Sequence, residues 1–334
     1  MTTIAAIDIG YRNTKYVCQA NPREPVRSHH FPSTAVKAEA NPAIGDALAQ
    51  RDTRLVEVDG MAYEVGPDAR LLLGPRSTQV LHEDFIDTPE YRALFLGALS
   101  YMGLSEIDVL VGGLPVRHMA AGKSALEAFM QGEHQVPGLG TVTIHRVSVV
   151  PQPVGGLVHH LRHSAPGARS DDVQLLVDPG FFTLDWTCAE GLKYLPALTG
   201  SFAAGISSGL KAVAEIVSEE LSVPFSDLDV LDRKLRQPEI RIGGREFDRN
   251  RIDEAIRKAL RPGIIEMRNQ IGSAVTVDRI VLCGGGAGYY EPLVREAWPN
   301  HSIVVLEDPL MANVRRFHLL AAQQARRFVP EVAA

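Results

Sequence analysis

The chain has 334 residues, more than a single hydrophobic core usually supports, so two domains are expected. Hydrophobic residues make up 45% and charged residues 22%, which is typical of globular proteins, and the formal net charge of −6 argues against direct nucleic-acid binding. No apolar run approaches the ~20 residues that span a bilayer, and no signal segment begins the chain, so we expect a cytoplasmic protein without direct membrane contact. The three cysteines, Cys18, Cys188 and Cys283, lack metal-site spacing and indicate buried thiols.

The first predicted element is a strand-turn-strand hairpin at the N-terminus. An apolar run over residues 4–9 carries Asp8 near its end, Gly10 permits a tight turn, and a second β-forming run leads from Asn13 to Val17. The hairpin therefore places a carboxylate at its tip.

The next stretch, residues about 21 to 54, is rich in Pro, Ala and polar residues and predicts irregular structure at the start of an inserted subdomain. A two-residue turn at Asp59-Gly60 predicts a second hairpin. Further elements are predicted in chain order: a helix at about 89–102, with Pro in its first turn and Gly just past its end, a strand at 108–111, a helix at about 118–131 and one strand at 141–149.

Gln152 stands between two prolines where the first half of the chain ends. The flanking prolines restrict the backbone, so this residue is either a turn glutamine or the polar group that orients an attacking water. His159, His160 and His163 follow, two of them spaced to share a helix face. Because no carboxylate or thiol stands nearby in the sequence, surface histidines are favoured over a metal site.

The hairpin pattern returns at residues 175–186. Gly follows the Asp by two positions in both copies (Gly10, Gly180), and a small polar residue follows by five (Asn13, Thr183). A charged residue follows by seven, as Lys15 in the first copy and Asp185 in the second. Two such hairpins, each opening one half of the chain, predict two related α/β halves whose hairpins face each other across a cleft.

The residue types at the two tips indicate phosphate chemistry. Glycine turns expose backbone N–H groups that can cradle a phosphate chain. Paired carboxylates repel phosphate unless a cation intervenes, so Asp8 and Asp178 together predict Mg²⁺, held directly or through its waters. Lys15 would neutralise phosphate charge. The expected ligand is a nucleoside triphosphate with magnesium.

The second half continues with a Gly-rich stretch at 200–209, which leads into an amphipathic helix to about 221. A helix at about 247–260 is predicted to break at Pro262-Gly263 and to resume at 264–271. A buried strand then ends in Gly284-Gly285-Gly286-Ala287, where side-chain-free backbone would accommodate the nucleoside. One more strand at 302–306 and a C-terminal helix to about 328 complete the chain.

The ordered set of hairpin, connecting segment, hairpin and glycine turn resembles the actin/Hsp70/sugar-kinase superfamily. The residues of these motifs are similar to those of the bacterial actin-like plasmid-segregation ATPases of the ParM/StbA type. The motifs that carry the resemblance are Asp8-Ile9-Gly10-Tyr11-Arg12-Asn13-Thr14-Lys15, Gly113-Leu114-Pro115-Val116, Pro151-Gln152, Asp178-x-Gly180-x-x-Thr183-x-Asp185, Gly284-Gly285-Gly286-Ala287 and Pro309-x-x-Ala312-Asn313-Val314.

The resemblance implies an α/β actin-like ATPase fold, with two related ribonuclease H-like domains and inserted subdomains around a nucleotide cleft. The first domain would be residues 1–152, with an insertion at about 26–86 and a C-terminal helix at about 310–334 completing it. The second would be residues 153–309, with an insertion at about 206–272.

The resemblance also implies the roles of individual residues. Gln152 and Asp178 would be catalytic, and Asp8 and Asp178 would bind Mg²⁺ through its water shell. The implied nucleotide-binding residues are Asp8, Gly10, Tyr11, Arg12, Asn13, Lys15, Gly180, Phe181, Phe182, Thr183, Gly284, Gly285, Gly286 and Ala287. Arg12, Phe181 and Phe182 depart from the small or polar residues usual in these loops and would crowd the phosphate path.

The function implied is ATP-driven assembly into filaments for plasmid or DNA segregation, through self-association and a DNA-bound adaptor protein, with GTP as an alternative nucleotide. Two other functions stay open. One is a nucleotide-gated scaffold that does not polymerise, and the other is a small-molecule kinase of the same fold, which would need a carboxylate aimed at a substrate hydroxyl. A chaperone ATPase is disfavoured because no β-rich substrate domain follows.

Overall fold

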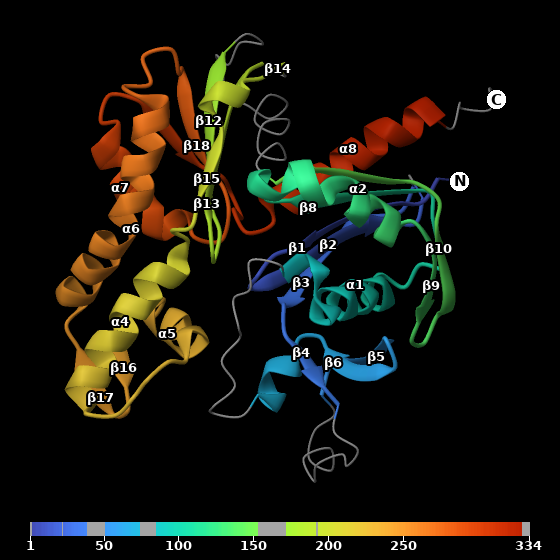
Figure 1. The fold of residues 1–334 in the computed structure, drawn as a ribbon, viewed down its shortest axis with the longest axis horizontal. Coiled ribbons are helices and arrows are strands. Elements are labelled where there is room, and N and C mark those ends of the chain that lie inside the picture. Colours follow the sequence, from blue (N-terminus) through green and yellow to red (C-terminus); the bar gives the residue numbers. More distant parts are fainter. Residues whose placement is uncertain are drawn as a thin grey trace. The chain divides into compact units, whose positions relative to one another are not determined.

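The computed structural model describes residues 2–21, 23–38, 51–73, 85–152, 172–191 and 193–328. The chain forms two compact units: unit 1 comprises Met1–Gly155 and Asn313–Ala334, and unit 2 comprises Gly156–Ala312. Each is a mixed α/β unit (Figure 1).

Unit 1 is organised around a five-stranded sheet of order β11-β8-β1-β2-β3. Strands β1 and β2 form the predicted N-terminal hairpin, β8 and β11 run parallel to β1, and β3 is antiparallel to β2. The bounds are β1 (Ile4–Ile9), β2 (Asn13–Gln19), β3 (Arg27–Pro32), β8 (Val109–Leu114) and β11 (Val147–Pro151). Strand β3 lies inside the stretch that the sequence predicted to be irregular. Only Phe31 of this strand is buried, so the sequence lacks the apolar alternation that marks a strand.

The two faces of this sheet meet different helices. Ile7, Leu110 and Val149 point into a core shared with α1 (Pro89–Met102) and α2 (Met119–Met130). Because neighbouring residues of a strand face opposite sides, Asp8 and Gly113 point to the other face. There α8 (Ala312–Phe328) lies, since its Phe317 contacts Gly113 and its Gln324 accepts a hydrogen bond from Ser148 of β11.

Helix α1 has the signals that the sequence predicted. The Thr88 hydroxyl accepts a hydrogen bond from the backbone N–H of Tyr91, Pro89 occupies the first turn, and Gly103 ends the helix at φ 67°. A left-handed residue at this position satisfies the last carbonyls of the helix.

Two small sheets complete unit 1. The orders are β7-β10-β9 and β4-β6-β5, with β7 (Glu106–Ile107), β9 (Gly132–Val136), β10 (Gly140–Ile144), β4 (Ala35–Lys37), β5 (Arg54–Val58) and β6 (Met61–Val65). Short 3-10 helices occupy Ala69–Leu72, Phe85–Asp87 and Val116–His118. The prediction of a single strand at 141–149 is wrong, because this segment forms β10 in one sheet and β11 in another. The partner changes at the bend: the His145 N–H donates to Ile107, whereas the Arg146 carbonyl accepts from Leu110.

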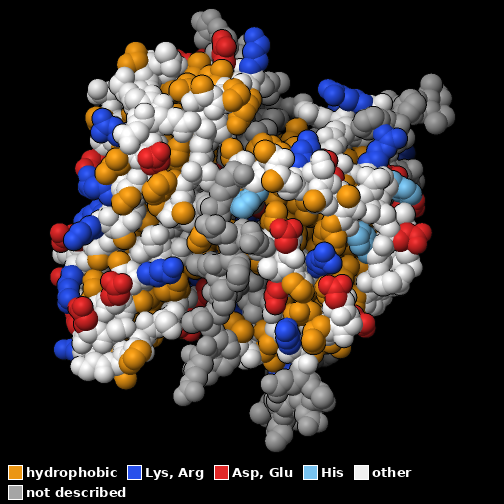
Figure 2. All heavy atoms as spheres, viewed as in Figure 1, with side chains coloured by type: hydrophobic (Ala, Val, Ile, Leu, Met, Phe, Trp, Pro, Cys, Tyr) orange, Lys and Arg blue, Asp and Glu red, His pale blue; other side chains and the backbone are white. Residues whose placement is uncertain are grey.

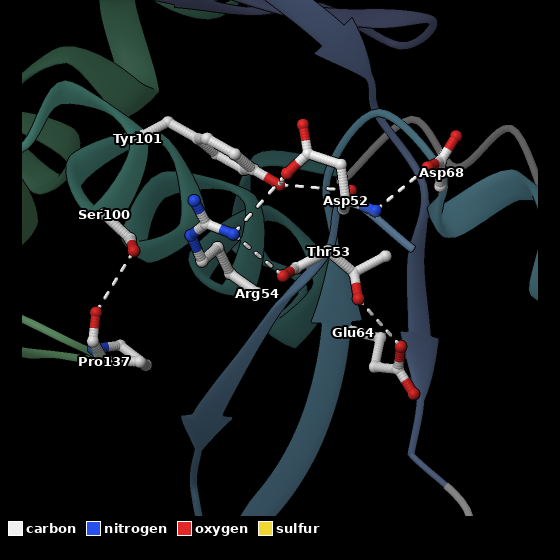
Figure 3. A network of polar contacts seen from close by, with 8 residues as sticks. All are labelled: Asp52, Thr53, Arg54, Glu64, Asp68, Ser100, Tyr101 and Pro137. Atoms are coloured by element: carbon white, nitrogen blue, oxygen red, sulfur yellow. Dashed lines mark hydrogen bonds and ion pairs between the residues drawn. The ribbon is translucent and has the colours of Figure 1, made fainter. Parts of the chain in front are cut away.

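The sheet β4-β6-β5 is held on α1 by a polar cluster (Figure 3). The Tyr101 hydroxyl of α1 donates to Asp52 Oδ1 at 2.9 Å, and the Arg54 guanidinium lies 4.3 Å from the centre of the Tyr101 ring. A side chain at Gly66, which has φ +138°, would overlap the Tyr101 hydroxyl. Glycine at this position therefore permits the contact.

Unit 2 contains a six-stranded sheet of order β14-β13-β12-β18-β19, in which β15 also pairs with β13. The bounds are β12 (Val173–Pro179), β13 (Leu184–Glu190), β14 (Lys193–Tyr194), β15 (Gly200–Phe202), β18 (Arg279–Leu282) and β19 (Ser302–Val305). One face packs against α4 (Ile206–Leu221), α6 (Arg249–Ile271) and α7 (Ala287–Ala297). The remaining elements are a 3-10 helix at Pro196–Leu198, α5 (Leu228–Leu235) and the hairpin of β16 (Ile240–Ile242) and β17 (Arg245–Phe247).

The predicted break at Pro262-Gly263 is wrong, because α6 runs unbroken through both residues. The buried face of the helix continues past the proline, with Leu260, Ile264 and Met267 all in the core. Burial of this long apolar stripe outweighs the local helix-breaking preference of proline.

Among the described residues, no helix is both long and apolar enough to cross a membrane. Charged side chains of both signs are scattered over the face shown in Figure 2.

Adjacent substitutions in α6 should have opposite effects on stability. Pro262 is exposed, so Pro262→Ala should raise the free energy of unfolding by ~1–3 kcal/mol through restored helix propensity. A methyl group at Gly263 would lie 3.0–3.2 Å from Leu184, Ala204 and Tyr290, so Gly263→Ala should lower it by ~1–3 kcal/mol. Urea unfolding of both variants measures the two effects. Equal shifts in the same direction would contradict the observed packing of α6.

His318 on α8 should make stability depend on pH. Burial lowers the pKa of its imidazole to about 4, below the ordinary value, so protons bind to the unfolded chain first as pH falls. Stability should therefore be complete above about pH 6.5 and decline towards pH 4, with a loss of about 2 kcal/mol by pH 5. His318→Gln cannot take up this proton. Urea unfolding at pH 7 and pH 5 should show a smaller loss in the variant, and an identical loss would rule out His318 as the source.

Candidate functional site

The tip of the first hairpin brings a carboxylate and an ammonium group together. Asp8 and Lys15 are directly opposite each other in the β1/β2 register, so their side chains share one face of the sheet. Lys15 Nζ lies 2.5 Å from Asp8 Oδ2, and the exposed fractions of the two side chains are 14% and 1%. The Gly10 N–H donates to the Asn13 carbonyl at 3.1 Å and closes the turn between them. Two residues seven positions apart in the sequence therefore form a partly buried ion pair.

Gln152 joins this pair from the end of β11. Its Nε2 donates to Asp8 Oδ1 at 2.7 Å, so each oxygen of Asp8 accepts from a different side chain. The backbone N–H of Gln152 donates to the Leu114 carbonyl at 2.8 Å, which fixes the residue to β8. Asp8, Gly113 and Gln152 thus lie at the carboxyl ends of three neighbouring parallel strands, the position at which α/β sheets commonly bind ligands.

Tyr11 and Arg12, both predicted to contact nucleotide, have structural contacts within unit 1. The Tyr11 ring stacks on Phe85 at 5.1 Å between centroids, and Phe85 meets the buried Tyr91 edge-on at 5.5 Å. The Arg12 carbonyl accepts from the Ser33 N–H at 2.8 Å. These contacts fix the loop between β1 and β2 to α1 and to the segment after β3.

The second hairpin repeats the turn of the first. The Gly180 N–H donates to the Thr183 carbonyl at 2.8 Å, the same bond that joins Gly10 to Asn13. Asp178 and Asp185 are directly opposite in the β12/β13 register, as Asp8 and Lys15 are in β1/β2. Both carboxylates are buried, and Thr183 Oγ1 donates to Asp185 Oδ2 at 2.6 Å. The two tips share a backbone design and differ in charge.

The carbonyls of the second turn cap α4. Those of Gly180, Phe181 and Phe182 accept from the backbone N–H groups of Ile206, Ser207 and Gly205, respectively, at 2.9–3.1 Å. The Gly-rich entry to α4, which the sequence suggested as a weak nucleotide contact, therefore has these three N–H groups satisfied within unit 2. The Phe181 side chain packs partly against the unit 2 core.

The glycine turn after β18 fits closely against the end of β12. The Gly284 N–H donates to the Pro309 carbonyl, and the Gly286 N–H donates to the Pro179 carbonyl at 2.8 Å. A side chain at Gly284, which has φ +80°, would overlap Asp178 Oδ1, and one at Gly286 would lie 2.7 Å from the Pro179 carbonyl. At both positions protein atoms fill the place of a side chain, so packing alone requires these glycines. A side chain added at Gly285 would lie 3.3 Å from Leu310. Helix α7 begins at Ala287.

The hydrogen bonding of Asp8 is compatible with a hydrated magnesium ion. The described residues contain no group of three or more His, Cys, Asp or Glu suited to a metal. Mg²⁺ usually keeps several waters and binds through one or two carboxylates together with substrate phosphates. Each oxygen of Asp8 accepts one side-chain bond here, and a carboxylate oxygen has a second lone pair for a metal-bound water. His159, His160 and His163 lie outside the described residues.

Sequence reasoning missed one residue of this region, Phe317 of α8. Its fully buried ring contacts Gly113 beside Gln152. An apolar residue on a C-terminal amphipathic helix gives no sign of such a position. The only signal was Gly113 itself, a glycine in a buried strand, which often marks close approach of another group.

Both halves of the chain match models of actin-related families. Residues 6–155 match the family described as actin like proteins N terminal domain. Residues 176–296 match the family described as archaeal actin homologue MreB-like, C-terminal. Each half of the chain is therefore similar to a family of actin relatives.

Solved structures extend the likeness to nearly the whole chain. The archaeal actin homologue Ta0583 superposes with a TM-score of 0.76 at 18% identity, covering 96% of this chain and 100% of that one. Its complex with ADP gives 0.73 at 16% identity, with coverage of 96% and 100%. A 15-stranded ParM filament from Clostridium botulinum gives 0.77 at 18% identity, with coverage of 96% and 99%. No curated protein matches the sequence significantly. The predicted two-domain actin-like α/β fold is thus confirmed.

Replacing Gly284 should disrupt unit 2 at Asp178. Gly284→Ala puts a side chain on a residue whose backbone is left-handed, and that side chain would displace the Asp178 carboxylate. The free energy of unfolding should therefore fall by more than ~2 kcal/mol. Gly288→Ala, four residues along, meets nothing within 4 Å and should change stability by no more than ~1 kcal/mol. Urea unfolding compares the two. If both variants were as stable as the wild type, the close fit of the glycine turn would be refuted.

Proposed function

We propose that the chain is an actin-like ATPase that binds Mg-ATP and assembles into nucleotide-dependent filaments. The observation that carries the proposal is the bonded group of Lys15, Asp8 and Gln152, with Asp8 buried, at the carboxyl ends of β1, β8 and β11. It combines a cation for phosphate, a carboxylate for hydrated metal and an amide for water.

The triphosphate-binding positions in this proposal come from the three turns. Lys15 compensates phosphate charge, and the turns after β1, β12 and β18 supply backbone around the nucleotide. The positions are those predicted from the sequence: Asp8, Gly10, Tyr11, Arg12, Asn13, Lys15, Gly180, Phe181, Phe182, Thr183, Gly284, Gly285, Gly286 and Ala287. The structure of Ta0583 with ADP supports nucleotide binding by this fold. ATP is the expected nucleotide and GTP the alternative.

Asp8 and Asp178 would hold Mg²⁺ through its waters, and the ion when bound would offset the charge of the phosphates. Gln152 orients the attacking water. Its amide nitrogen donates to Asp8, so the carbonyl oxygen of the same amide is the acceptor available to a water. Asp178 assists by accepting a proton or a hydrogen bond from that water.

The proposal also includes assembly into filaments and a DNA cargo. Two relatives of the same fold are described as filaments, the ParM filament from Clostridium botulinum and the Alp12 filament. Self-association into a filament of the ParM/StbA type would serve plasmid or DNA segregation. With a net charge of −6, the chain would reach DNA through a DNA-bound adaptor protein.

The first test combines light scattering, high-speed pelleting and phosphate release. Wild-type protein with Mg²⁺ and ATP should scatter light and pellet, and the polymer should decay as phosphate appears. With ADP, polymer should be weak. A protein that binds ATP but neither hydrolyses it nor pellets would instead be a nucleotide-gated scaffold. Phosphate transfer to an added sugar or glycerol would identify a kinase.

Three substitutions separate the proposed roles. Lys15→Ala should weaken ATP binding by at least ~10-fold, because one charge-assisted contact is worth ~1.5–3 kcal/mol. Gln152→Ala should lower phosphate release ~10²-fold while ATP affinity stays within a few-fold, and Asp178→Ala should abolish release. Fluorescent ATP binding and phosphate release measure these effects.

Matched controls are Lys258→Ala and Gln135→Ala, two exposed residues outside the proposed site. Both should behave as the wild type. Wild-type turnover in Asp178→Ala would refute the catalytic assignment, and a large loss of ATP affinity in Gln152→Ala would mark Gln152 as structural.

A further inference from the structure

We propose that Phe317 of α8 is a positioning residue that sets the orientation of Gln152 for hydrolysis, an inference that rests on the proposed ATPase function. Phe317 touches no proposed substrate group. It acts on the stem of Gln152 through the space above Gly113.

The geometry at Gly113 brings the two side chains together. A side chain at Gly113 would overlap the Phe317 ring and would lie 3.1 Å from Gln152 Cγ. The ring and the stem of Gln152 therefore approach the same point from different elements, one from α8 and the other from β11. Any residue other than glycine at position 113 would place a side chain where the Phe317 ring lies.

The rest of Gln152 is fixed at two other atoms. Its N–H donates to the Leu114 carbonyl at 2.8 Å and its Nε2 donates to Asp8 Oδ1 at 2.7 Å. Between these two anchors runs a stem with rotatable bonds, and no hydrogen bond can restrain its carbon atoms. The Phe317 ring supplies the steric restraint, because it occupies the space beside the stem.

Helix α8 is itself held firmly enough to act as a support. Phe317 and Val314 are fully buried, as is Ala321. Further along, Ser148 Oγ of β11 donates to Gln324 Oε1 of the helix at 3.1 Å. The helix therefore lies against the same strand that carries Gln152.

The consequence is specific to turnover. A bound nucleotide depends on Lys15 and the turns, whereas the attacking water depends on the direction of the Gln152 amide. Phe317→Leu shortens the support and frees the stem, so kcat should fall between about 10-fold and 100-fold, as expected for misplacing a reacting group by about 1 Å. KM for ATP should stay within about two-fold.

Two double variants test whether the effect passes through Gln152. In a Gln152→Ala background, Phe317→Leu should cause no further fall in kcat, since the positioned amide is already absent. Gly113→Ala alone should lower kcat, because its methyl group displaces the ring and the stem. Combined with Phe317→Leu, that methyl group occupies vacated space, so the pair should recover turnover relative to either single variant.

Phe95→Leu is the matched control. Phe95 is equally buried but lies in the core on the opposite face of the sheet. Its loss should lower the melting temperature by an amount similar to Phe317→Leu and leave kcat unchanged. If both variants lowered kcat alike, the effect of Phe317 would be one of general stability and the proposal would fail.

A readout without hydrolysis keeps the two proposals distinguishable. In protein labelled with ¹⁵N-glutamine, the side-chain amide signal of Gln152 is identified by its loss in Gln152→Ala. Phe317→Leu should shift this signal, and Phe95→Leu should not. An unmoved signal, or additive kcat losses in the Gln152→Ala background, would overturn the positioning role. If the wild type showed no hydrolysis but the signal moved, the ATPase proposal would fail and the positioning of Gln152 by Phe317 would stand.

Discussion

Unit 1 depends on one buried charge, the carboxylate of Asp8 at the end of its central strand. A buried carboxylate is tolerated only when it is paired and hydrogen-bonded, and Asp8 has Lys15 on one oxygen and Gln152 on the other. The β1/β2 register places Lys15 opposite Asp8. The parallel pairing of β8 and β11 places Gln152 at the same end of the sheet. A one-residue slip of either pairing would turn a partner to the opposite face and leave the charge unmatched.

The two hairpins show how one backbone design can carry opposite charges. Both close with the same glycine bond, and both place an aspartate opposite the residue seven positions later. In unit 1 that residue is Lys15, which neutralises its aspartate. In unit 2 it is Asp185, whose Oδ2 accepts a hydrogen bond from the Thr183 hydroxyl. The same hairpin design therefore carries a cation opposite the aspartate in one unit and a second carboxylate in the other.

The sequence predicted what depends on local chemistry. Both hairpins, the ends of α1 and the turn after β18 follow from glycine, proline and alternation within a few residues. The failures arose where distant partners decide. His145 and Arg146 break a continuous β pattern because the strand changes sheets there, and Pro262 stays helical because the core beneath it is continuous. For the site, the sequence placed Asp8 and Lys15 in one hairpin but did not predict the ion pair between them. The bond from Gln152 and the contact of Phe317 join residues far apart in sequence.

The glycines illustrate a wider limit on motif reasoning. A glycine-rich turn suggests space for a ligand, yet at Gly284 and Gly286 protein atoms already fill that space, and at Gly113 an aromatic ring does. At two of these glycines the missing side chain lets a proposed site residue approach the backbone: Asp178 at Gly284, and Gln152 with its aromatic neighbour at Gly113. Glycine therefore acts on the candidate site indirectly, by fixing where a proposed catalytic side chain lies. Because a rigid support holds a side chain more precisely than a mobile loop does, close packing of this kind would serve the proposed catalysis as well as stability.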